Sequence, residues 1–387
     1  MRLHRFWVAG FATIAMLLVL SIGMGSQVKA ENMLQDIPRL DGVNIYFTEA
    51  AGEASRFDRG TAGLSRFAGL LRELGANLFT LEWRTTFPTD ADLIVIAGPT
   101  GDLLPDQTAR LWSYVNNGGK MLLFANPTVE TRNRAFPSGG GMFALMWTDM
   151  GIRGLDDVVA SEGALLPILA EVTAEPLPEA TEVIVPESVE GTTPQPTFTL
   201  APTATAQFVQ VGERRTLNST FSTTRLIEHP ITDGIEEPLN FFTARSLEVD
   251  SGIQGFQVTP LIFTEEDYYG ESDWASYLTS GVFDFNIGLD TAEGILPLSA
   301  AYSNERTGTR LVVVGDREFV SNGGGFKTSP TNSSGFVYPG NVRFALNAVT
   351  WMLDVEAAEF TFPSPAPTAT VTITPSPSPT RTPTPGG

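Results

Sequence analysis

The stretch from residue 92 to 127, DLIVIAGPTGDLLPDQTARLWSYVNNGGKMLLFANP, constrains the fold of this chain most strongly. Residues 93–97 are continuously apolar, which is typical of a short strand buried on both faces of a parallel sheet. Pro105 and Asp106 then indicate a helix start, because proline fixes a helical φ and an acidic side chain favours the positive helix end. Apolar residues follow at helical spacing, and Gly118 and Gly119 predict the helix end. A second buried strand is predicted at 121–125. Because strand–helix–strand crossovers are right-handed and place the helix on one sheet face, the stretch predicts a doubly wound α/β domain.

The flanking segments extend this pattern in both directions. The apolar periodicity predicts strands at 43–47, 77–83 and 309–315, and helices at 62–74, 141–152 and 341–353. The order of these elements implies parallel pairing through crossovers. Strand candidates at 241–249 and 258–264, together with a threonine-rich stretch at 212–224, predict a second half that is rich in β-structure.

Composition separates three further segments from this domain. Arg2, His4 and Arg5 precede an apolar run of roughly 30 Å as a helix, so residues 1–30 form either a cleaved signal peptide or an uncleaved membrane anchor. In both interpretations the rest of the chain is exported. Residues 174–206 and 363–387 are rich in Pro, Thr and Ser, and such tracts bury too little apolar surface to order, so both are predicted to be disordered. The α/β domain is therefore predicted over 40–173 and 207–357.

The charge and the rare residue types exclude several functions. The 387 residues include 44 acidic and 24 basic side chains, a formal net charge of −20, and a surface this negative repels the phosphates of nucleic acids. There is no cysteine, which excludes disulfides, thiolate metal sites and a cysteine nucleophile. The only histidines are His4 and His229. No cofactor and no metal site is predicted, because the acidic clusters lack the ligand spacing of a calcium loop.

Three polar residues remain candidates for a ligand crevice. Thr100, Asn126 and Asp316 each follow a predicted strand directly, and open α/β sheets bind ligands at the carboxyl ends of their strands. For Asp316 the sequence leaves two interpretations, a ligand contact or hydrogen bonds that close its own loop, and favours the second. Residues 98–102 are interpreted as a tight turn because they lack a dinucleotide or phosphate-loop fingerprint. Arg245 is expected to pair with a carboxylate that the sequence does not identify.

Six motifs together resemble a known family. The sequence is similar to the gliding-motility-type auxiliary proteins of ABC transporters, whose glutamine-amidotransferase-like α/β domain also occurs in an intraflagellar-transport protein. The resemblance implies a flavodoxin-like or class I glutamine-amidotransferase-like fold. It also implies a membrane-tethered, extracytoplasmic domain that works beside an ABC-type permease. The motifs are, in order, LGANL, residues 90–127, HPITDGI, FFTARSLEV, RLVVVGDREFVSN and GNVRFALNAVTWML.

The comparison with amidotransferases has a chemical consequence. In that fold the nucleophile follows a strand that resembles residues 121–124, and this chain has Ala125 there. A methyl group cannot attack a substrate, and no Gly-x-Ser-x-Gly elbow supplies a serine. His229, in a His-Pro turn, is interpreted as a partly buried histidine bonded to backbone. The chain is therefore not expected to be an enzyme.

These observations predict a non-catalytic extracytoplasmic auxiliary domain, held at the cell membrane by its N-terminal segment and associated with an ABC-type permease or another envelope protein. A secreted or surface-displayed module that binds glycan or peptide is the alternative, and cleavage after Ala30 would favour it. A hydrolase with an unrecognised site is the second alternative.

Overall fold

The structure, a computed structural model, describes residues 39–49, 51–83, 87–127, 137–172, 207–252, 255–280, 290–330 and 335–355. The predicted signal or anchor (1–30), the predicted insertion (174–206) and the predicted tail (363–387) lie outside these ranges. Within them, no helix combines the length and the apolar character needed to cross a membrane.

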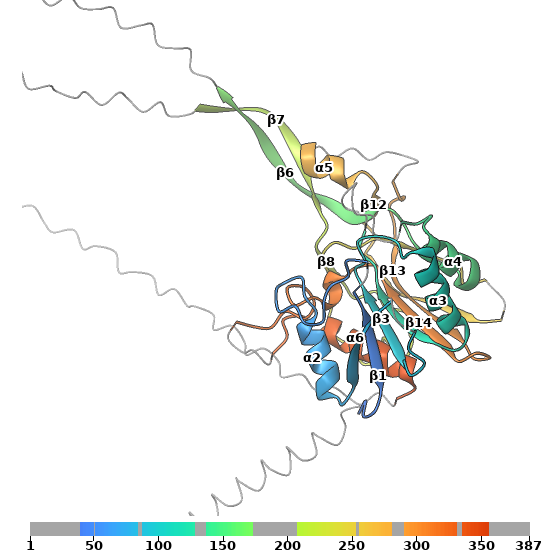
Figure 1. The fold of residues 1–387 in the computed structure, drawn as a ribbon. Helices are drawn as coiled ribbons and strands as arrows, with labels where there is room; N and C mark the ends of the chain where they lie inside the picture. Colours follow the sequence, from blue (N-terminus) through green and yellow to red (C-terminus); the bar gives the residue numbers. More distant parts are fainter. Residues whose placement is uncertain are drawn as a thin grey trace, which may run out of the picture.

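A seven-stranded sheet forms the centre of the protein (Figure 1). Its strand order is β11, β13, β14, β4, β3, β1, β2. Neighbouring strands from β2 to β14 run parallel, while β13 and β11 extend the β14 side in antiparallel pairing. The predicted mostly parallel α/β sheet is thus confirmed. The strands are β1 (Asn44–Thr48), β2 (Asn77–Leu81), β3 (Leu93–Ala97), β4 (Lys120–Phe124), β11 (Gln257–Phe263), β13 (Pro297–Asn304) and β14 (Thr309–Val314).

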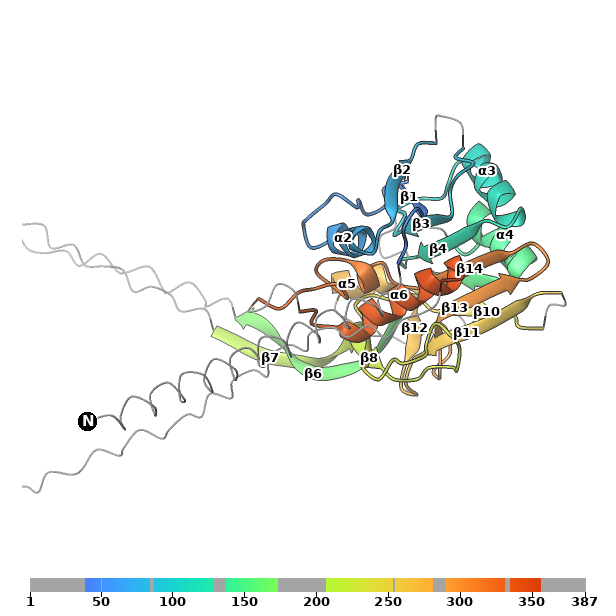
Figure 2. The ribbon, with the colours of Figure 1, turned by 90° about the horizontal axis from the view of Figure 1, so that it is seen from below.

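Helices cover both faces of this sheet, as a doubly wound domain requires (Figure 2). Helices α2 (Ser65–Glu73) and α6 (Pro339–Leu353) pack with Val95, Leu122 and Val312 in one core cluster. Helices α3 (Pro105–Asn116) and α4 (Gly141–Met150) pack with Ile94, Leu123 and Val313 in the other. Alternate residues of each central strand therefore point to opposite cores, which explains why these strands read as continuous apolar runs.

The central crossover has the predicted elements for the predicted reasons. Pro105 occupies the first turn of α3, and the Gln107 side chain accepts a hydrogen bond of 2.9 Å from the N–H of Leu104. After the helix, Gly118 takes a φ of +95°, a conformation that favours glycine. Strand β4 starts two residues later. In the same way α4 ends before the predicted residue 152, because Gly151 takes a φ of +68°.

The second half differs from the sequence-based expectation in two places. The single strand predicted at 241–249 is two short strands, β9 (Leu239–Phe241) and β10 (Leu247–Val249), which pair with β8 (Phe221–Thr223) and β5 (Ile152–Gly154). The chain leaves the strand conformation between them because the residues there bond to the ends of β14 and β6 instead. Strand β13, which the sequence did not predict, is held by pairing with β14 and β11.

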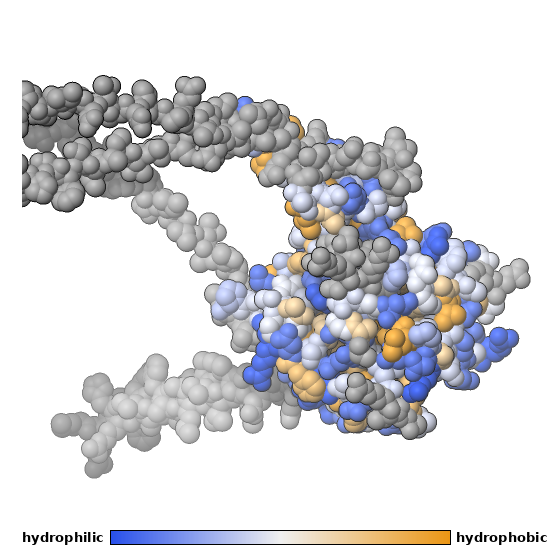
Figure 3. Space-filling model, turned by 45° about the horizontal axis from the view of Figure 1, so that its top comes forward, coloured by the Kyte–Doolittle hydropathy of each residue, from blue (hydrophilic) through white to orange (hydrophobic). Residues whose placement is uncertain are grey.

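A long β-ribbon also extends from the body of the domain (Figure 1). It consists of β6 (Val158–Val172) and β7 (Gln207–Asn218), and β12 (Tyr269–Glu271) pairs with the base of β6. Helix α5 (Trp274–Ser280) packs on the ribbon through Trp274, and the Tyr277 hydroxyl accepts a hydrogen bond of 2.6 Å from the N–H of Leu217. The predicted insertion therefore falls between the two strands of this ribbon. On the face shown in Figure 3, hydrophobic residues lie as separate spots among hydrophilic ones, as is usual for a globular surface.

Candidate functional site at the carboxyl edge of the sheet

The loops that follow β3, β4 and β14 meet at the carboxyl edge of the parallel strands. The backbone ladder continues one residue past each strand: the N–H of Gly98 donates to the Phe124 carbonyl (2.7 Å), and the N–H of Ala125 donates to the Val314 carbonyl (2.8 Å). The loops that carry Thr100, Asn126 and Asp316 therefore start side by side, as the sequence predicted. Their side chains then bond to different partners.

Asp316 is fully buried and bonds to backbone. Its Oδ1 accepts from the N–H of Glu318 and its Oδ2 accepts from the N–H of Phe242, both at 2.7 Å. The first bond closes the loop of Asp316 itself, which confirms the interpretation that the sequence favoured. Burial and then the nearby Glu318 carboxylate raise the pKa of Asp316 well above its usual range, against the opposite effect of the two backbone N–H groups.

Asn126 joins the loop of Asp316. Its side-chain oxygen accepts from the N–H of Arg317, and its Nδ2 donates to Glu318 Oε2 at 3.0 Å. Arg317 and Glu318 in turn form an ion pair. The structure therefore brings Asn126 and Asp316 together through the two residues that follow Asp316. Sequence reasoning did not select Arg317 and Glu318, although their place directly after the most apolar late strand was a usable signal.

Thr100 belongs to a different contact. Its hydroxyl and its N–H both donate to the carbonyl of Ala51, at 3.0 Å and 2.7 Å, so it holds the loop between β1 and α2. The Arg317 side chain also approaches the loop that carries Thr100. A Cβ atom on Gly98 would come within 2.2 Å of Arg317 Cδ, so the arginine stem crosses the backbone just before Thr100.

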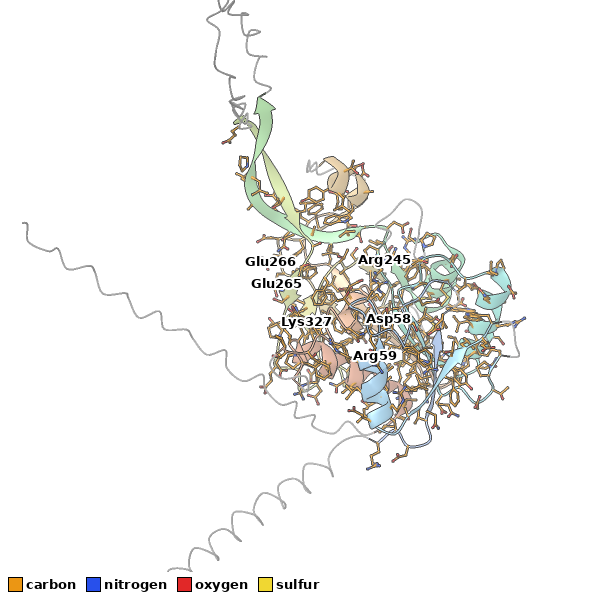
Figure 4. All side chains as sticks on the ribbon, turned by 60° about the vertical axis from the view of Figure 1, so that its left-hand side comes forward. Asp58, Arg59, Arg245, Glu265, Glu266 and Lys327 are labelled. Carbon is orange, nitrogen blue, oxygen red and sulfur yellow. The ribbon has the colours of Figure 1, made fainter. Side chains whose placement is uncertain are left out.

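Arg245 fastens this edge to the base of the β-ribbon (Figure 4). The side chain is fully buried; its Nε donates to the Leu155 carbonyl (2.7 Å) and its Nη1 donates to the Asn126 carbonyl (3.1 Å). Its Nη2 forms the ion pair with Asp156 at 3.0 Å, which identifies the carboxylate that the sequence left open. Burial lowers the pKa of Arg245, while Asp156 and Asp157 act in the opposite direction. Arg245 therefore holds the loops at this edge in place, and its guanidinium is not exposed to a ligand.

The chemical capacity of the edge is limited. Ala125, which directly follows β4, is fully buried. Three buried polar atoms here lack a hydrogen-bond partner among the described residues: Thr48 Oγ1, Glu53 Oε1 and Arg317 Nε. The described residues contain no group of three or more His, Cys, Asp or Glu side chains that could hold a metal ion. The arrangement can position loops and offer isolated donors and acceptors, and Ala125 supplies no nucleophile.

His229, the other candidate for acid–base chemistry, lies far from this edge. Its Nδ1 accepts a hydrogen bond of 3.1 Å from the N–H of Ile231, so it bonds to backbone as expected. It lines a hollow together with Lys120, the first residue of β4, whereas Ala125 follows the last residue of that strand. Five strand residues span roughly 16 Å. His229 therefore cannot act on a group placed at Ala125.

Comparisons with known proteins agree with the family resemblance. A model of the ABC transporter auxiliary family, described as "ABC-type uncharacterized transport system", matches residues 43–348. No curated protein matches the sequence. Some solved structures resemble the chain with TM-scores below 0.5. They include the mmIFT52 N-terminal domain (13% identity, TM-score 0.44, covering 80% of this chain and 97% of that one), the cytoplasmic protein STM3548 from Salmonella typhimurium (10%, 0.37, 80% and 98%) and the exo-beta-1,4-mannosidase Op5Man5 from Opitutaceae bacterium strain TAV5 (12%, 0.31, 85% and 38%).

Proposed function

The chain belongs to the ABC transporter auxiliary family, and from this membership we propose that it is a non-catalytic, extracytoplasmic subunit that docks onto an ABC-type permease. The family match over residues 43–348 carries the proposal, because it covers nearly the whole described domain. The basic residues and apolar run at the N-terminus support export and attachment to the membrane.

The fold supports the non-catalytic part of this proposal. The parallel strands have the order β2, β1, β3, β4, β14, which corresponds to the 2-1-3-4-5 order of flavodoxin-like folds and supports that finer assignment. In such a fold the chemistry belongs at the carboxyl edge, where this chain has Ala125. The other polar groups at that edge, Asn126 and Asp316, hold loops together.

A reconstitution experiment tests the docking. The full chain, carrying a C-terminal affinity tag, is purified in mild detergent from its native membranes, and co-purifying proteins are identified by mass spectrometry. A permease and an ATPase of the ABC type are expected. As a matched control, the same chain with its apolar run 6–25 replaced by a cleavable export signal is added to membrane vesicles with and without that transporter. Equal binding to both kinds of vesicle would contradict docking through the folded domain.

The non-catalytic part of the proposal has its own test. Ester, amide and glycoside substrates are screened with the full chain, and no turnover above the uncatalysed rate is expected. Turnover that disappears in Asp316→Asn or His229→Ala would overturn this part and favour the hydrolase alternative, while leaving the docking experiment unaffected.

A further inference from the structure

A row of polar side chains crosses the sheet at its amino-terminal edge, where β4 and β14 begin. Lys120 of β4 pairs with Arg310 of β14, Arg310 pairs with Ser303 of β13, and Ser303 pairs with Gln257 of β11. Side chains alternate between faces along a strand, so these four share the face that α6 covers. The next row on that face, with Leu122, Val312 and Ala301, is buried and apolar. The polar row is therefore a departure from the pattern of the core.

The HPITDGI motif and the end of α6 cover this row. His229 and Pro230 come from the motif, and Trp351 and Asp354 come from the end of the helix. The His229 and Trp351 rings meet edge to face with centroids 5.0 Å apart. The turn is fixed to α6 because Asn347 Nδ2 donates to the carbonyls of Ile231 (3.1 Å) and Asp233 (3.0 Å). Row and cover line a hollow of about 510 Å³, within the range of small-molecule sites.

The two cations of the row differ in their partners. Arg310 forms an ion pair of 2.9 Å with Asp354, and its guanidinium lies 5.1 Å from the centre of the Trp351 ring. Lys120 stands directly beside it and has no ion pair with any described residue. Like charges on paired positions are unfavourable. Glu305 also lines the hollow, from the turn between β13 and β14, but among the described residues it forms no ion pair with Lys120.

The remaining polar groups of the hollow add neutral donors. His229 accepts a hydrogen bond at Nδ1, and burial lowers its pKa to about 4, so the neutral ring carries its proton on Nε2 at neutral pH. The Ser303 hydroxyl and the Gln257 amide can donate as well. A lysine that has no ion pair with any described residue, in a hollow that also offers these neutral donors, is suited to a ligand whose oxygen atoms accept hydrogen bonds and carry negative charge.

We propose that this hollow binds an anionic oxygen group, either a carboxylate or a phosphate, with Lys120 as the ionic contact and His229, Ser303 and Gln257 as neutral donors. The site lies at the opposite edge of the sheet from Asn126 and Asp316, and it does not depend on the docking role proposed above. It gives the HPITDGI turn a function in addition to packing on α6. It also explains why a lysine occupies a row whose inner neighbours are apolar.

Lysine acylation tests the site directly, because the chain contains only Lys29, Lys120 and Lys327. Lys327, labelled in Figure 4, is exposed in the loop that follows the carboxyl end of β14 and serves as the internal control. The full chain in detergent is treated with an amine-reactive acetylating reagent in chloride, inorganic phosphate or acetate at equal ionic strength, and each lysine is quantified by mass spectrometry. At ten times the dissociation constant of the effective anion, labelling of Lys120 is expected to fall about tenfold.

Comparison of the three anions identifies the kind of ligand. Protection by phosphate alone identifies a phosphate ligand, protection by acetate alone identifies a carboxylate, and unchanged labelling of Lys120 relative to Lys327 in every arm overturns the proposal. Thermal unfolding gives a second measure. Lys120→Gln is expected to abolish the gain in Tm that the effective anion produces, whereas Lys327→Gln keeps it. A Lys120→Gln variant that retains the full gain would also overturn the site.

Discussion

Replacing Arg245 with methionine removes the guanidinium that joins the base of the ribbon to the carboxyl edge of the sheet. Methionine keeps an unbranched apolar stem against Phe143, whose ring lies 5.0 Å from the guanidinium carbon. The change leaves the carbonyls of Leu155 and Asn126 without these donors. The lost hydrogen bonds are therefore expected to dominate the effect over the loss of packing.

The magnitude follows from the contacts. Each carbonyl that loses its interior partner costs about 1–3 kcal/mol. The Asp156 side chain is 43% exposed, so water replaces most of that ion pair and it adds little. Relief from burying a cation offsets part of the cost, since burial lowers the pKa of Arg245. The net loss is expected to be about 3 kcal/mol, a large share of the stability of an ordinary domain.

Urea unfolding followed by tryptophan fluorescence measures this loss. With a slope of about 3 kcal/mol per molar urea, the midpoint of unfolding is expected to fall by about 1 M. Arg39→Met is the matched control, because Arg39 forms an ion pair of similar length with Asp41 (2.7 Å) but both side chains are exposed. That variant is expected to unfold at the wild-type midpoint. An unchanged midpoint in Arg245→Met would refute the argument that this buried arginine fastens the edge.

Three further predictions concern pKa values and backbone conformation. Because the pKa of Asp316 is raised in the folded state, its contribution to stability is present at acid pH and is lost as pH rises through the folded pKa. The stability of Asp316→Asn relative to wild type should therefore increase from pH 4 to pH 7. A constant difference would contradict the raised pKa. Burial lowers the pKa of His229 to about 4, and an NMR titration should show this value. The stability that the buried neutral ring contributes should be lost as pH falls from 6.5 towards 4. A measured pKa above 6 would show that the ring is hydrated. Gly98→Ala should lower stability by about 1–2 kcal/mol through its backbone φ of +63° alone, whereas Gly69→Ala, in α2 with open space around it, should raise stability in the same unfolding assay.

Much of the fold followed from local patterns. Helices α2, α3 and α6 and strands β1, β3, β4 and β14 were predicted within a few residues, because the apolar period and the helix-ending glycines are properties of neighbouring residues. Strand β13 and strand β6 of the ribbon were missed, whereas β7 overlaps the threonine-rich stretch at 212–224 that was expected to contain β-structure. Their conformation is stabilised mainly by strands far away in the sequence, such as β14 for β13, and no local period identifies such a partner.

The candidate site shows the same division. Asn126 and Asp316 were predicted to meet because each directly follows a parallel strand, and their loops do meet through Arg317 and Glu318. Thr100 follows a strand in the same way, yet its hydroxyl is taken up by the carbonyl of Ala51. The choice among these hydrogen-bond partners depends on the path of the β1–α2 loop, which the sequence does not specify.

The sequence by itself determined the α/β class and the likeness to the ABC transporter auxiliary family, because residue identity and short-range periodicity are local. Only the tertiary structure decided which charges meet. Arg245 lies beside Asp156, and Lys120 lies beside Arg310 under the HPITDGI turn, through contacts between residues that are far apart along the chain. Burying a charged group costs free energy unless a partner compensates for it, so the folded structure brings such partners together. The size of that cost depends on the packing of the whole molecule, which the sequence alone does not give.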